Sequence, residues 1–332
     1  MPISRREFIV CVAAGLSVFA TGSLAGCSAA SDADSGITTI NITEQGKAKR
    51  DELKQTDCAA YFAEENYSDL LESITAEDLN VFPSVETTMP QSHTEIAGSS
   101  VYKLENDDAS CTVFYIHGGS YAFGIYPSQV SLCEKLATQL GAQVLIPLYP
   151  LAPNGNCLDA YAFLDAAYEE ALSAGKPIYL VGDSAGGGLA CAFAEHLRDK
   201  GTELPGGLVL FSPWLDVTLC NPDIAAYEQK DIQLKRYGLA ELGKLWADSL
   251  DTTDPCVSPI YGDVSGLPPT LLVVGTEEIM CPDTTKLYEM LKDANVKTQL
   301  VYGEGLWHVY VVSDIPEAAS TLDIVEEFCK NI

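Results

Sequence analysis

Ser184 stands at the centre of the pentapeptide GDSAG, residues 182–186, which has the form G-x-S-x-G. A run of apolar residues at 177–181 precedes it, and a helix-like pattern follows from Ala185. Between a strand and a helix, the small glycines of this pattern permit a sharp turn that exposes the serine hydroxyl. The positive end of the helix favours the negative charge that develops when such a serine reacts. The pattern therefore predicts that Ser184 is a nucleophile.

A serine nucleophile needs a base that removes its proton, and histidine is the usual choice. The chain has four histidines, which are His93, His117, His196 and His308. The first lies in an irregular stretch, the second belongs to a glycine loop, and the third lies about three helical turns beyond Ser184. His308 follows the last expected strand, at 298–302, and so lies at the carboxyl end of a strand, where Ser184 also lies. We expect His308 to be the base.

A carboxylate must orient the histidine and stabilise its protonated form. The loop after the expected strand 270–274 offers Glu277, Glu278 and Asp283. Each of them satisfies the chain order nucleophile, acid, histidine that is typical of α/β-hydrolases. We favour Glu278, with Asp283 as the alternative acid and Glu277 as the third choice.

A second glycine motif, His117-Gly118-Gly119-Ser120, directly follows the apolar run 111–116. Glycines allow main-chain N–H groups to approach a substrate oxygen closely and to stabilise it as an oxyanion. Such a loop alone could be only a turn, but together with the serine pentapeptide it predicts an oxyanion hole.

The elements that must position these residues alternate between apolar runs and helix-like patterns. Strands are expected at residues 111–116, 144–148, 177–181, 208–211, 270–274 and 298–302, and helices at 128–140, 159–174, 185–200, 283–294 and 315–329. Continuous apolar strands of this kind predict a mostly parallel sheet with helices on both faces. The stretch 216–259 interrupts the alternation and is interpreted as a lid over the site, or else as a surface excursion.

The N-terminus has the pattern of an export signal. Arg5 and Arg6 precede an apolar stretch at residues 8–25, which favours the twin-arginine route. The stretch ends in Leu-Ala-Gly before Cys27 and resembles a lipoprotein cleavage site. We expect residues 1–26 to be the signal, Cys27 to be lipidated and 27–50 to contain a flexible linker. The protein would then be exported and anchored to the outer face of the cell membrane; a permanent membrane helix is the alternative.

Composition excludes several classes of function. The chain has 332 residues, 47% of them hydrophobic, and a formal net charge of −28. Hydrophobic content this high excludes wholesale disorder, and the negative charge argues against nucleic acid as a partner. None of the 11 cysteines forms a CxxC or Cys/His cluster, so no metal site is expected. Nine cysteines remain outside residues 1–27, which leaves at least one unpaired within the chain, and no pairing is assigned.

Several motifs occur together in one order along the chain. They are His117-Gly118-Gly119, GDSAGG at 182–187, SPWLD at 212–216, Asp254-Pro255 with Ser258-Pro259, GLPP at 266–269, and Glu304-Gly305 with His308. From about residue 95 to the C-terminus, the chain resembles the bacterial hormone-sensitive lipase family of carboxylesterases. The resemblance implies an α/β-hydrolase core at 51–332, a helical cap from about 51–95 and 216–259, and no metal or organic cofactor.

The resemblance also implies roles for single residues. Ser184 would be the nucleophile, His308 the base, and Glu278 the acid, at a position where the family commonly has aspartate. The N–H groups of Gly119, Ser120 and Ala185 would form the oxyanion hole, with Gly118 shaping the turn. Ser120 replaces the usual third glycine, which matters if the position requires a positive φ.

The expected activity is hydrolysis of small, neutral, short-chain carboxylic esters, acetyl esters among them, through an acyl-enzyme. An amidase, arylformamidase or peptidase on the same fold is the alternative. A non-catalytic binding module is less favoured because nucleophile, base and acid are all present. The oligomeric state stays open.

Overall fold

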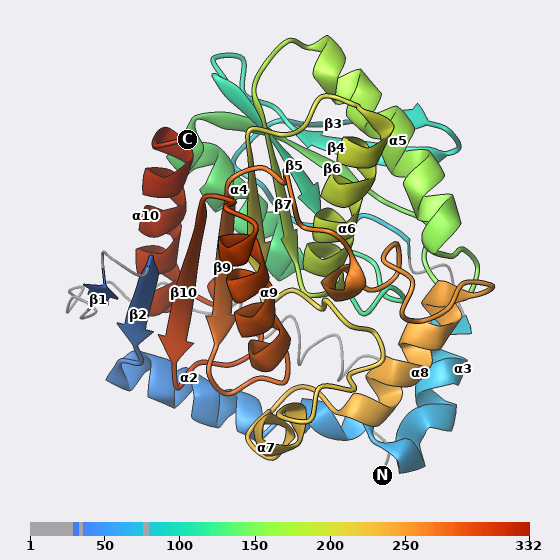
Figure 1. Ribbon diagram of the computed structural model, residues 1–332, viewed down its shortest axis with the longest axis vertical. Helices are drawn as coiled ribbons and strands as arrows, with labels where there is room; N and C mark the ends of the chain where they lie inside the picture. Colours follow the sequence, from blue (N-terminus) through green and yellow to red (C-terminus); the bar gives the residue numbers. More distant parts are fainter. Residues whose placement is uncertain (1–28, 33–35, 76–79) are drawn as a thin grey trace.

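The computed structural model describes residues 29–32, 36–75 and 80–332, and within them ten strands form one sheet (Figure 1). The strands are β1 (Ala29–Asp32), β2 (Ile37–Asn41), β3 (Gln91–Ile96), β4 (Ser99–Leu104), β5 (Cys111–Ile116), β6 (Ala142–Pro147), β7 (Ile178–Asp183), β8 (Gly207–Phe211), β9 (Thr270–Gly275) and β10 (Thr298–Glu304). Their spatial order is β1-β2-β10-β9-β8-β7-β5-β6-β4-β3. The strands from β2 to β6 in this order are parallel, whereas β1, β4 and β3 pair antiparallel at the edges.

Successive side chains of a strand point to opposite faces of the sheet, so continuously apolar strands make both faces apolar. Helices cover both faces and bury these side chains. In β5, Val113 and Tyr115 join one apolar cluster and Phe114 and Ile116 join the other. Helices α4 (Pro127–Leu140) and α10 (Pro316–Lys330) cover the first face; α5 (Cys157–Ser173), α6 (Ala185–Lys200) and α9 (Cys281–Asp293) cover the second. The prediction of a mostly parallel α/β sheet with helices on both faces is confirmed.

The expected linker at 27–50 is partly wrong. β2 pairs in parallel with β10, so residues 37–41 extend the sheet. Helix α2 (Glu44–Lys54) follows directly; Thr43 caps it by accepting a hydrogen bond from the N–H of Gly46. The expected boundary at residue 51 therefore falls inside a helix. The local pattern could not reveal this, because the partner strand lies about 260 residues further along the chain.

Shorter helices lie beyond the carboxyl ends of the parallel strands (Figure 1). They are η1 (Cys58–Phe62), η2 (Glu64–Asn66), α3 (Tyr67–Thr75), α7 (Ile224–Glu228) and α8 (Arg236–Ala247). The short helix η3 (Pro259–Tyr261) instead packs against α6. Gly238 of α8 lies so close to η1 that an added Cβ would meet the Cα of Phe62 at 2.8 Å. The rings of Tyr67 and Tyr237 meet edge-to-face at 5.9 Å. We call residues 58–75 and 216–259 together the cap. The cap expected over 51–95 included β3 wrongly, since that strand belongs to the sheet.

Several expectations for the N-terminus lie outside the described residues, namely the signal at 1–26 and the lipidated Cys27. Within the described part of the chain, no helix has both the length and the apolar character needed to cross a membrane. Nine cysteines are located there, and seven of them are buried. Small buried cysteines of this kind pack as apolar residues.

Candidate active site

Ser184 occupies the sharp bend between β7 and α6. Its backbone has φ +53° and ψ −123°, a conformation that residues other than glycine rarely adopt. The bend requires small neighbours: a Cβ on Gly182 would collide with the main chain of Gly186, and one on Gly186 would collide with the carbonyls that end β5. The bend presents the Ser184 hydroxyl above the carboxyl end of the sheet.

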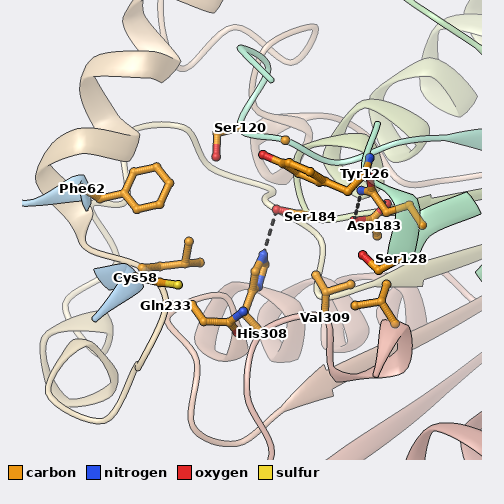
Figure 2. A pocket seen from close by; sticks show the side chains of 14 residues that line it. Cys58, Phe62, Ser120, Tyr126, Ser128, Asp183, Ser184, Gln233, His308 and Val309 are labelled. Atoms are coloured by element: carbon orange, nitrogen blue, oxygen red, sulfur yellow. Dashed lines mark hydrogen bonds between the residues drawn. The ribbon is translucent and has the colours of Figure 1, made fainter. Parts of the chain in front are cut away.

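His308 lies between the serine and a carboxylate (Figure 2). Its Nε2 is 2.9 Å from Oγ of Ser184, and its Nδ1 is 2.5 Å from Oε2 of Glu278. Residues from three separate loops, spread over about 124 positions of sequence, thus form one hydrogen-bonded chain. In this arrangement, the neutral imidazole can accept the serine proton at Nε2 while Nδ1–H donates to the carboxylate.

Glu278 is fully buried, and its second oxygen is also hydrogen-bonded. Oε1 accepts hydrogen bonds from the Ser212 hydroxyl and from the N–H of Gly275, both at 2.7 Å. The same hydroxyl of Ser212 accepts the N–H of Val309 at 3.0 Å. Ser212 therefore connects the acid to the residue that follows His308. Ser212 belongs to the SPWLD motif, but its role could not be predicted from the local sequence, because the contact with Glu278 spans 66 positions.

The other two candidate acids face elsewhere. Asp283 is buried but accepts a hydrogen bond from the Asn221 amide at 2.7 Å. Glu277 pairs with Arg50 of α2 at 2.9 Å. The same guanidinium nitrogen donates to the carbonyl of Gly305 at 3.0 Å. Arg50 thus connects the loop of Glu278 to the loop of His308, a role that sequence analysis missed because α2 was expected to be partly linker.

The predicted oxyanion loop has an uncommon backbone. Gly119 (φ +129°), Ser120 (φ +53°) and Tyr121 (φ +60°) follow one another with positive φ, so Ser120 does occupy a left-handed position. The N–H of Gly118 donates to Asp183 at 2.9 Å, which agrees with a role in shaping the turn. The N–H groups of Gly119, Ser120 and Ala185 take no part in the hydrogen bonds of the described residues and remain available for a substrate oxygen.

Asp183 holds this loop against the serine bend. Its carboxylate is buried and accepts hydrogen bonds from Tyr115 at 2.5 Å and from the Gln129 amide at 2.9 Å, besides the N–H of Gly118. Burial raises the pKa of Asp183, and these donors oppose the rise. Neither Tyr115 nor Gln129 carried a signal in the sequence, since both lie in ordinary core elements.

The pKa values of two histidines near the site shift in opposite directions. Burial lowers the pKa of His308, but the carboxylates of Glu278, Asp231 and Asp183 raise it more, so the net pKa lies above its ordinary value. Burial lowers the pKa of His117 to about 4. The Nδ1 of His117 lies 2.8 Å from the carbonyl of Gly118 and its ring stacks on Tyr149. His117 is therefore neutral near pH 7, and its contacts are with the glycine loop and Tyr149.

The remaining histidines lie in other parts of the fold. His196 lies 3.0 Å from Asp165 and stacks on Phe193, and His93 stacks on Tyr102 near the edge of the sheet. None of these contacts of His196 and His93 involves Ser184 or its neighbours in the site.

A pocket of about 630 Å³, partly open to solvent, surrounds the Ser184 hydroxyl. The core contributes Tyr126, Ser128 and Val309 to its wall, and the cap contributes Cys58, Phe62, Gln233 and Leu234. Figure 2 shows the cap side chains and the core side chains on opposite sides of Ser184. In the described part of the chain, no group of three or more His, Cys, Asp or Glu side chains is arranged to hold a metal ion.

Comparison with known proteins agrees with this geometry. Residues 113–312 match a protein family that is described as having the alpha/beta hydrolase fold. The chain belongs to this family. The match covers more than half of the chain, including the serine bend, the glycine loop and the histidine.

Proteins similar in sequence to this α/β-hydrolase include an esterase and an acetyl-hydrolase. An esterase of Acinetobacter venetianus is 33% identical over 230 residues, which cover 68% of this chain and 76% of that protein. An acetyl-hydrolase of Streptomyces hygroscopicus is 34% identical, covering 66% of this chain and 75% of its own. A solved esterase from the bacterial hormone-sensitive lipase family has a TM-score of 0.71 and 27% identity, with 80% and 89% of the two chains covered. The resemblance to that family is confirmed.

Proposed function

We propose that this α/β-hydrolase is a serine carboxylesterase that hydrolyses short-chain esters through an acyl-enzyme. The observation that carries the proposal is the hydrogen-bonded chain from Ser184 through His308 to Glu278, beside a loop of available N–H groups. The relatives named esterase and acetyl-hydrolase support the same activity, as does a 28% identical protein of Pseudomonas putida named ethyl acetate hydrolase.

In the first half of the reaction, Nε2 of His308 takes the hydroxyl proton while Oγ of Ser184 bonds to the acyl carbon. The carbonyl electrons move to its oxygen, which the N–H groups of Gly119, Ser120 and Ala185 stabilise. As the carbon–oxygen bond to the alcohol breaks, His308 delivers its proton to the departing alcohol. Water then attacks the acyl-enzyme with His308 again as the base, and Ser184 and the free acid are released.

The pocket favours small and uncharged substrates. Phe62, Leu234 and Val312 give it apolar walls that suit a short acyl chain. The chain carries a formal net charge of −28, which repels anionic esters as they approach. Acetyl and similar short esters of neutral alcohols fit both features.

The test is a series of p-nitrophenyl esters with acyl chains from two to twelve carbons, hydrolysed by wild type and Ser184→Ala. We expect the highest kcat/KM with the shortest chains and a loss of at least about ten-thousandfold in the variant. Highest activity with long chains would contradict the substrate assignment. Faster cleavage of the matched anilide than of the ester would instead favour an amidase.

We further propose that the protein is exported and anchored to the outer face of the cell membrane through a lipid on Cys27. The order of Arg5 and Arg6, an apolar stretch and Leu-Ala-Gly before Cys27 supports this proposal. Wild type and Cys27→Ser are compared by metabolic labelling with a fatty acid and by membrane fractionation. We expect only the wild type to carry the label and to sediment with membranes. A labelled variant would exclude Cys27 as the acylated residue.

A further inference from the structure

A buried carboxylate in the cap contacts the candidate site without belonging to the chain from serine to acid. Asp231 lies between α7 and α8 and is 5% exposed. Its Oδ1 accepts the N–H groups of Gln233 at 2.8 Å and Leu234 at 2.9 Å. Its Oδ2 accepts the N–H of Ile279 at 2.9 Å, across 48 positions of sequence. Each oxygen therefore binds a different part of the molecule.

Both of those parts belong to the site. Gln233 and Leu234 form the cap wall of the pocket, and Figure 2 shows Gln233 beside His308. Ile279 is the residue directly after Glu278. One carboxylate thus fixes the position of the cap wall relative to the loop that carries the acid. A shift of about 1 Å in such a group can change a rate about a hundredfold.

The negative charge of Asp231 also acts on His308. The carboxylates that raise the pKa of His308 are Glu278, Asp231 and Asp183, from three different elements. Burial raises the pKa of Asp231 to about 6, while the positive charge of His308 and the N–H donors oppose the rise. The charged groups that line the hollow beside Asp231 are Lys54, Asp57, Glu65 and Lys235. Of the carboxylates that act on His308, Asp231 is the one supplied by the cap.

We propose that Asp231 is a positioning residue for ester hydrolysis, which holds the Glu278 loop against the cap wall and stabilises the protonated His308. The inference rests on the proposed esterase function. Protonated His308 forms as Ser184 attacks and is consumed as the alcohol departs, so a fixed negative charge beside it lowers the barrier to both steps.

The test compares wild type, Asp231→Asn and Asp231→Glu by the pH dependence of kcat and KM with p-nitrophenyl acetate. In Asp231→Asn, the amide oxygen still accepts the cap N–H groups, but the amide nitrogen faces the N–H of Ile279. We expect kcat to fall about tenfold or more with KM changed less than about threefold. We expect the acid limb of kcat/KM to move down by about half a pH unit or more, because His308 loses a neighbouring negative charge. Asp231→Glu keeps the charge, and its acid limb should stay at the wild-type position.

Asp283→Asn is the matched control. It also removes a buried aspartate that connects the cap to the segment after Glu278, through Asn221, but its charge is not among those that raise the pKa of His308. We expect no movement of its acid limb. Rates are expressed per Ser184 titrated by a fluorophosphonate. Partial unfolding of a variant then reduces the number of titrated sites but does not move the acid limb. If Asp231→Asn gives no titrated site, Asp231→Ser replaces it.

An acid limb of Asp231→Asn at the wild-type position would overturn the inference, and so would equal movements in Asp231→Asn and Asp283→Asn. A wild-type protein that neither reacts with the fluorophosphonate nor cleaves the ester would instead overturn the proposed function. The two failures are therefore distinguishable.

Discussion

Backbone strain concentrates at the residues around the reacting serine. Ser184 and the run from Gly119 to Tyr121 all have positive φ, and such conformations cost about 1–3 kcal/mol at residues other than glycine. The surrounding packing maintains them: the ring of Tyr121 stacks on Trp246 at 4.3 Å and on Trp214 at 5.3 Å. A strained loop held this firmly presents its N–H groups without rearrangement during the reaction.

Ser120 tests the importance of this strain. Ser120→Gly removes the steric cost of a positive φ, so we expect wild-type kcat and a melting temperature that does not fall. Ser120→Val places a β-branched side chain at φ +53°, and we expect a loss of about 1–3 kcal/mol together with a lower kcat. Thermal unfolding and ester hydrolysis measure both. Equal behaviour of the two variants would show that the backbone at this position can relax.

The charge state of His308 predicts the pH dependence of the rate. Glu278 and its neighbours raise the pKa of His308 above the ordinary value of about 6.5. As the pH decreases, His308 therefore becomes protonated at a higher pH than an ordinary histidine does. We expect kcat/KM to fall with decreasing pH, with the acid limb above about pH 6.5. His117, with a pKa of about 4, stays neutral over this range and does not contribute. A rate that is flat between pH 5 and 8 would contradict the assignment of His308.

The choice of acid can be tested by paired substitutions. Glu278→Gln removes the charge beside Nδ1 of His308, and we expect kcat/KM to fall about a thousandfold or more. Asp283→Asn should retain most of the activity, since Asp283 bonds to Asn221 instead. The kinetic comparison at one pH above the acid limb decides between them, and the reverse ranking would reassign the acid.

Among the elements, helix α2 has an unexpected relation to the site. Arg50 connects Glu277 to the carbonyl of Gly305, and so restrains the two loops that carry Glu278 and His308. We expect Arg50→Ala to lower kcat about tenfold with little effect on KM, because the pocket walls stay in place. Lys47→Ala removes a solvent-exposed pair on the same helix and should change neither. Equal rates for both variants would show that the loops hold their positions without Arg50.

Elements were predictable from the sequence where one local signal decided them. β5, β7 and β9 are buried on both faces and are almost continuously apolar, and the serine bend follows from glycines that are adjacent in sequence. β3 is mostly exposed and polar, so it gave no such signal. The contacts of Ser212, Arg50 and Asp231 join positions that are far apart in the chain, and local periodicity cannot encode them.

On the scale of the whole molecule, the acidic composition predicts discrimination by charge. We expect kcat/KM for an ester bearing a free carboxylate to rise with salt, while that of a neutral ester of equal size stays constant. At about 0.15 M ionic strength, the repulsion is screened beyond about 8 Å. Rates measured between low salt and this ionic strength test the expectation. A neutral ester that responds as strongly would indicate a salt effect on the enzyme itself.

The pairing of β2 with β10 has a consequence for biosynthesis. An early strand and a late strand meet in the sheet, and the triad assembles from residues 184, 278 and 308. A nascent polypeptide that has exposed its serine still lacks the imidazole and the carboxylate until translation has passed residue 308. We infer that a nascent chain that has not yet reached His308 cannot hydrolyse esters through this triad, although its serine bend is already complete in sequence.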